Sequence, residues 1–258
     1  MRLMKRILSA AAVLALSASL LVGCSSGTAS SVPVSASSAA ESTVSSVEET
    51  ASSAVDENEA AAVQLLNDLT GSYQELWPVI LADEYKQTWL DDCTALVGED
   101  NAEAAFEKLS SMVTGDVYGE DAVKAYANGG GAYFCGFTNS LAILTFDGET
   151  STISGTDKDG NVLFSHTYHY IGMEPVRGLY EFQSDDADSG EFTYFFLAPD
   201  TSAETYHIEF RYGSDAEALS QYDTGEYAYW LASGISTDCD QTMIDNCIEL
   251  FCTENLAG

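Results

Sequence analysis

The sequence predicts an α+β domain in which a helical opening is followed by an antiparallel β-barrel. Before residue 129 the apolar residues recur at helical intervals, and after it they form short β-branched and aromatic runs divided by turns. The part from Glu59 onwards spans roughly 200 residues, enough for one domain with a buried core. With six or more strands and no long helical crossover, closure into a barrel removes the exposed strand edges.

The first residues are typical of a bacterial lipoprotein signal. Three basic residues precede an apolar run from Ile7 to Val22, which is long enough for a signal core and short for a spanning helix. The run ends in Leu21-Val22-Gly23-Cys24, where a small residue precedes a cysteine. We therefore expect a signal peptide over residues 1–23, a lipid on Cys24, and a membrane-anchored protein at the extracytoplasmic face. The alternative is an ordinary secretory signal.

The segment after the cysteine has the composition of a tether. Residues 24–58 are rich in Ser, Ala, Thr, Val and Glu, with one proline and no aromatic residue. Such a segment buries too little apolar surface to offset the entropy of ordering it. We expect an unstructured stalk over residues 24–58 and a folded domain over residues 59–258.

Helical spacing of apolar residues predicts the α part. Gly71 separates the first two candidates. The expected helices are Ala60–Leu69, Tyr73–Trp89 and Asn101–Met112 at the start, with Asp215–Gln221 and Met243–Phe251 closing the domain.

After the glycines at 129–131, runs with strand character follow one another and are divided by Asp-Gly and similar turns. This succession indicates an antiparallel meander. The expected strands are Ala132–Phe137, Leu141–Phe146, Val162–Ile171, Leu179–Phe182, Glu191–Leu197 and Tyr206–Tyr212.

Charge and cysteine content limit the partners. Nine Lys and Arg against 41 Asp and Glu give a formal net charge of −32, which excludes nucleic acid because phosphate contacts need basic residues. Such acidity suits attraction to cations, or simply a solvated surface.

Besides Cys24 there are five cysteines, so at least one thiol has no partner within the chain, and their spacing assigns no disulfide.

An enzyme is not expected. The sequence holds no G-x-S-x-G, no H-E-x-x-H, no Walker-type loop and no G-x-G-x-x-G. The glycines at 129–131 precede a predicted strand, so they lack the helix N-terminus that holds a phosphate. Cys135 lies in an apolar run, where a buried and unreactive thiol is usual.

The predicted strand at 206–212 carries the strongest candidate site. Because side chains alternate in a strand, His207, Glu209 and Arg211 share one face and an aromatic row occupies the other. Either row suits the lumen, and a lumen-facing His207 and Glu209 could bind one cation. The alternative is a solvent-facing row with Glu209 paired to Arg211. The other two histidines, His166 and His169, should leave their strand on opposite faces, at the surface or the core edge.

Four stretches resemble the ZinT family, whose metal-binding domains also form the C-terminal part of AdcA-type zinc-capture lipoproteins. They follow the family order and span most of residues 63 to 251. Leu69–Pro78 is similar to the family's leading helical motif, and Val176–Phe182 is similar to its G-x-R-Y-x-F-E strand. His207–Asp215 is similar to its H-x-H-x-x-x-G-x-D strand and turn, and Gly225–Ser236 falls where the family has an aromatic tract. The resemblance implies a calycin/lipocalin-like barrel and zinc handling, either as surface scavenging or as delivery to a metal ABC transporter.

The metal site implied by the resemblance is altered in this chain. The family uses both histidines of H-x-H and one from a D-H pair, whereas here His207 is kept, Glu209 replaces the second, and the third has no counterpart. Asp200, in the preceding loop, is our candidate third ligand, with a plain turn residue as the alternative. We predict a divalent-cation site of His207, Glu209 and Asp200 that takes zinc, or a harder ion such as manganese or calcium.

Two functions of other classes stay open. One is a barrel that has lost the metal and binds a small apolar or aromatic ligand in its mouth. The other is a structural or adhesive surface protein.

Overall fold

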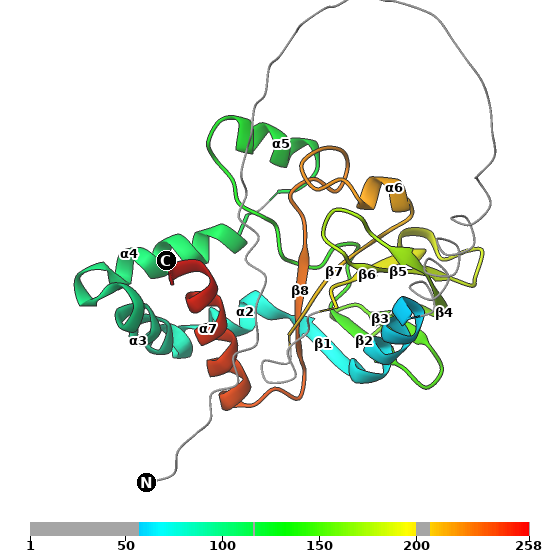
Figure 1. Ribbon diagram of the computed structural model, residues 1–258, viewed down its shortest axis with the longest axis horizontal. Helices are drawn as coiled ribbons and strands as arrows, with labels where there is room; N and C mark the ends of the chain where they lie inside the picture. The colour runs from blue at the N-terminus through cyan, green and yellow to red at the C-terminus, as the bar shows by residue number, and fades with distance from the viewer. Residues whose placement is uncertain (1–56, 116, 200–206, 258) are drawn as a thin grey trace, which may run out of the picture. The chain divides into compact units, whose positions relative to one another are not determined.

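The computed structural model describes residues 57–115, 117–199 and 207–257 (Figure 1). The predicted signal peptide, Cys24, and all but the last two residues of the predicted stalk lie outside these ranges. Within them, no helix has both the length and the apolar character that a membrane crossing requires.

Eight antiparallel strands form a closed barrel. Each strand pairs with its neighbours in chain order, and β1 pairs with β8 to close the cylinder, with Tyr73 opposite Ser236. The predicted α+β class with a calycin-like, up-and-down barrel is therefore confirmed. The strands are β1 Gly71–Glu75, β2 Ile143–Asp147, β3 Thr152–Thr156, β4 Val162–Met173, β5 Tyr180–Ser184, β6 Tyr194–Leu197, β7 His207–Gly213 and β8 Ala232–Ser236.

Large aromatic side chains fill the barrel. The register places Phe182 opposite Phe195, and Phe195 opposite Tyr212, so one buried row runs across β5, β6 and β7. The rings of Phe195 and Tyr212 stack with centroids 5.4 Å apart. Burying each such ring contributes on the order of 2 kcal/mol, which makes this interior the main source of stability.

The helical residues 57–68 pack against the barrel core. Leu65 and Leu66 of this helix and Leu69 after it are buried in the same apolar cluster as Phe146 and Ile153. Thr70 Oγ1 accepts a hydrogen bond of 3.0 Å from the backbone of Gly148, in the β2–β3 turn. The predicted helix at 60–69 is therefore present and covers the barrel at this turn.

A second apolar cluster lies outside the barrel, where four helices pack on one another and on β8 (Figure 1). Ile235 of β8 is fully buried in this cluster, so the outer face of β8 is its floor. The four helices are α2 Leu76–Ile80, α3 Lys86–Val97, α4 Glu99–Val113 and α7 Gln241–Leu256. Short helices complete the domain: η1 Asp83–Tyr85, α5 Glu120–Ala127, η2 Gly190–Phe192 and α6 Ala216–Leu219.

Two element predictions were wrong, and two strands were not predicted. Residues 71–75, at the start of the expected helix 73–89, form β1, because this segment pairs with both β2 and β8 to close the barrel. The run 132–137 forms no strand and makes only isolated bridges through Phe134, to Thr114 and Trp230. Strands β3 and β8 were missed altogether.

Candidate functional site

The outer face of β7 carries the candidate site. Ile208, Phe210 and Tyr212 point into the barrel, where they belong to its apolar core. His207 lies directly opposite Ile235 across the β7–β8 pair, and Ile235 packs on the helices outside the barrel. His207 and Glu209 therefore share one face, as predicted, but this face is the outside of the barrel. The lumen-facing arrangement considered for this pair is therefore not the one found, because the aromatic row occupies the interior.

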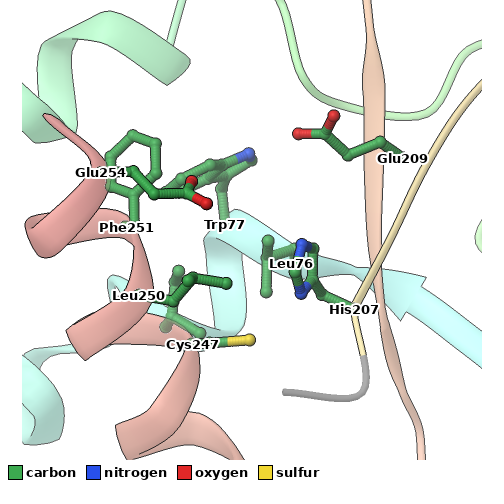
Figure 2. Close-up of a pocket in the computed structure, with 9 residues that line it drawn as sticks. Leu76, Trp77, His207, Glu209, Cys247, Leu250, Phe251 and Glu254 are labelled. Atoms are coloured by element: carbon green, nitrogen blue, oxygen red, sulfur yellow. The ribbon is translucent and has the colours of Figure 1, made fainter. Parts of the chain in front are cut away.

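An open groove separates this face of β7 from α2 and α7 (Figure 2). Three elements contribute its lining. The lining residues are Leu76, Trp77 and Ile80 of α2, His207 and Glu209 of β7, and Cys247, Leu250, Phe251 and Glu254 of α7.

The polar side chains project into this groove from two walls. In Figure 2 the His207 ring and the Glu209 carboxylate extend from β7, while the Cys247 sulfur and the Glu254 carboxylate extend from α7. His207 and Glu209 are half-buried, Cys247 is buried and Glu254 is exposed. The groove thus combines one imidazole, one thiol and two carboxylates, which are the groups that bind divalent metals in proteins.

Local sequence explains how each wall is placed. β1 runs directly into α2 at Glu75-Leu76, with Pro78 in the first turn, where the missing N–H costs no hydrogen bond. The Trp77 ring then meets Phe251 of α7 edge to face, with centroids 4.7 Å apart. The Asp240 side chain caps α7 by accepting a hydrogen bond of 3.0 Å from Met243 N.

Two buried side chains lie at or near the groove: Trp77 lines it, and Cys135 is close to Glu209. The Trp77 indole is 8% exposed, and its Nε1 lacks a hydrogen-bond partner among the described residues. Burial raises the pKa of the Cys135 thiol to about 12, and the negative charge of Glu209 adds to this rise. Cys135 is therefore a neutral thiol at physiological pH and not a ready metal ligand.

Arg211, the third polar residue of β7, takes no part in the groove. Its guanidinium is fully buried, donates to the carbonyl oxygens of Leu219, Gln221 and Tyr227, and lies over the Tyr222 ring at 4.3 Å. The alternative of a solvent-facing Glu209 to Arg211 pair is therefore wrong.

The remaining predicted ligand and the other histidines lie elsewhere. Asp200 falls outside the described residues. His166 Nδ1 and Asp186 Oδ2 are 2.7 Å apart, and His169 Nδ1 and Asp185 Oδ1 are 2.6 Å apart. His166 has a mostly buried side chain and His169 an exposed one, in agreement with their predicted opposite faces.

Cys247 and Glu254 were missed by sequence reasoning. They are seven residues apart on α7 and therefore lie on one helical face, with Leu250 and Phe251 between them. The spacing was visible in the sequence, but nothing showed that this face lies opposite β7. Within the described ranges, no three His, Cys, Asp or Glu residues are close enough to hold one metal ion.

Comparisons with known proteins give a likeness of structure only. No protein-family model matches the chain, and no curated protein does. The chain is similar to the Zn(II)-bound ZinT-like domain of Streptococcus pneumoniae AdcA, with 15% identity and a TM-score of 0.45, over 71% of this chain and 89% of that one. It is also similar to Zn(II)-bound AdcA from the same organism, with 14% identity and a TM-score of 0.43, over 72% of this chain but 35% of that one. The zinc belongs to those proteins.

Proposed function

We propose that this chain is a lipid-anchored, extracytoplasmic protein that binds a divalent cation, zinc above all, in the groove between β7 and helices α2 and α7. The observation that carries the proposal is the side-by-side projection of His207 and Glu209 into one groove (Figure 2). The chemistry is capture of a cation, with no bond made or broken in a substrate.

The composition of the groove favours zinc. Zinc accepts imidazole nitrogen, carboxylate oxygen and thiolate sulfur together, whereas calcium and magnesium are bound by oxygen. His207 and Cys247 supply nitrogen and sulfur, and Glu209 and Glu254 supply oxygen. These groups project from two walls of one groove, and Asp200 is our predicted additional ligand from the segment before β7.

The described part of the barrel does not favour the alternative of a small apolar ligand. The barrel interior is occupied by packed aromatic rings, including Phe195, Phe210 and Tyr212, which are each fully buried. A small apolar ligand would have to displace these side chains.

Zinc titration of the metal-free full chain tests the proposal. We expect binding at micromolar or lower concentration, weakened at least about tenfold in His207→Ala and in Glu209→Gln, because each loses one ligand. His169→Ala is the matched control, since this histidine lies on β4 beside Asp185. It should bind zinc like the wild type.

Repeating the titration by calorimetry with manganese and with calcium identifies which ion the groove prefers. A response to calcium that survives His207→Ala would indicate an oxygen site and reject the zinc assignment. Absence of heat and of a thermal shift with all three ions would overturn the metal-binding proposal.

The cellular part of the proposal rests on the sequence around Cys24. A lipid there would hold the domain at the membrane surface, where it could retain zinc or deliver it to a metal ABC transporter. We expect labelled palmitate to enter the wild-type protein in a bacterial host and the protein to sediment with membranes. Cys24→Ser should abolish the label, and an unchanged label would exclude this attachment site.

A further inference from the structure

Two cysteines far apart in sequence meet in the second apolar cluster. Cys93 lies on α3 and Cys252 on α7, and their sulfur atoms are 3.9 Å apart. Both side chains are fully buried and both are thiols in this structure. Both cysteines belong to the buried cluster that α3 and α7 share, so this contact lies within a packed interface.

We propose that Cys93 and Cys252 form a disulfide bond that joins α3 to α7 in the protein after export. The sulfurs need to approach by about 2 Å to reach the bonded distance of about 2.05 Å, a change that small rotations of the two side chains share. This pairing selects two of the cysteines that the sequence left unassigned.

The bond forms by thiol–disulfide exchange with a disulfide oxidant, either a thiol–disulfide oxidoreductase or a small-molecule disulfide. The Cys93 thiolate attacks one sulfur of the oxidant, whose other sulfur leaves as a thiol, and a mixed disulfide results. The Cys252 thiolate then attacks the Cys93 sulfur and releases the second thiol. In total the two cysteines lose two protons and two electrons, and the oxidant disulfide is reduced to two thiols.

Burial determines when this exchange takes place. In the folded protein both side chains are fully buried, so a disulfide oxidant in solution does not reach their sulfur atoms. Exchange therefore occurs while the chain folds, before α7 is packed on α3. Once formed, the bond is shielded from reductants by the same burial.

The crosslink would fix one wall of the groove. Cys252 follows Phe251 directly and lies two residues before Glu254, and both of these residues line the groove. The bond also closes a long loop that contains strands β2 to β8, because the cysteines are 159 positions apart. Constraining so long a loop in the unfolded chain stabilises the folded state.

Refolding of the reduced, denatured full chain in a mixture of reduced and oxidised glutathione tests the proposal. Alkylation in denaturant followed by digestion without reductant should yield one linked pair of peptides that contains Cys93 and Cys252. The thermal midpoint of the oxidised protein should lie about 5 to 10 °C above that of the same protein with reductant.

Two variants test whether the crosslink is formed by Cys93 and Cys252 in particular. Cys247→Ser, which changes a groove cysteine, should retain the crosslink and the response to reductant. Cys252→Ala should lose both. Recovery of the wild-type protein with Cys93 and Cys252 both alkylated, or with either linked to another cysteine, would overturn the proposal. None of these readouts depends on zinc, so they stand apart from the test of the groove.

Discussion

At the scale of single residues, Arg211 shows how a polar residue of β7 is used for structure. Its guanidinium is fully buried, and its two terminal nitrogens donate to backbone carbonyls of α6 and of the segment that links α6 to β8. Burial lowers the pKa of Arg211, but arginine starts so high that it stays charged. The residue therefore holds the chain after α6 against the barrel, while its neighbours in the row, His207 and Glu209, line the groove.

We predict that Arg211→Met lowers the free energy of unfolding by about 3 to 5 kcal/mol, because buried carbonyl oxygens lose charged donors. Urea denaturation of the purified protein measures this change. Arg177→Met is the matched control, since Arg177 lies over the same Tyr222 ring at 4.6 Å but is exposed. Its expected cost is below about 1 kcal/mol. Equal losses in both variants would contradict the role given to burial.

Sequence reasoning at this scale found the shared face of His207 and Glu209 but not its direction. Alternation in a strand follows from backbone geometry, so the shared face was predictable. Whether this face points into or out of the barrel depends on which row of β7 side chains the other strands bury. The aromatic residues of β4, β5 and β6 pack with the aromatic row of β7, and this leaves His207 and Glu209 outside. Cys247 and Glu254 were missed for the same reason, because their place in the site depends on how α7 docks.

At the scale of elements, small residues explain the missed strands. β3 contains Gly155, where an added Cβ would meet the side chains of Leu141 and Phe164. β8 contains Gly234, where a Cβ would lie 3.1 Å from Ile208 Cγ1. Glycine at these places leaves room for large neighbours inside the barrel, but it also removes the strand signal from the sequence. β1 was missed because its pairing with β2 and β8 outweighs a weak local preference.

Helix α7 begins at a strong cap, and this leads to a prediction. We expect Asp240→Ala to lower the free energy of unfolding by about 1 kcal/mol, because Met243 N loses its side-chain acceptor. Faster hydrogen exchange should appear in the first turn of α7, before Cys247. Asp240→Asn keeps an acceptor oxygen and should stay close to the wild type in both measurements. A stability loss in the asparagine variant equal to that in the alanine variant would show that the cap hydrogen bond is not the cause.

At the scale of the whole molecule, the protein combines a highly acidic composition with a barrel interior rich in tyrosine. Burial raises the pKa of Tyr73 to about 12 and raises that of Tyr168 and Tyr212 as well. Unfolded tyrosine ionises near pH 10. The folded protein therefore holds these protons more tightly than the unfolded chain. The corresponding stability is complete below pH 10 and is lost as the pH rises towards the folded values.

We predict that the protein unfolds cooperatively in alkali above about pH 10, with tyrosinate absorbance rising together with loss of circular dichroism. Tyr73→Phe should resist alkali better than the wild type, because phenylalanine has no proton to lose. The gain should be about 1 kcal/mol at pH 11, where the unfolded tyrosine is ionised and the folded one is mostly neutral. At pH 7 both proteins carry a neutral ring, so the gain should vanish there. An advantage of Tyr73→Phe that is equally large at both pH values would instead come from packing, and the ionisation argument would fail.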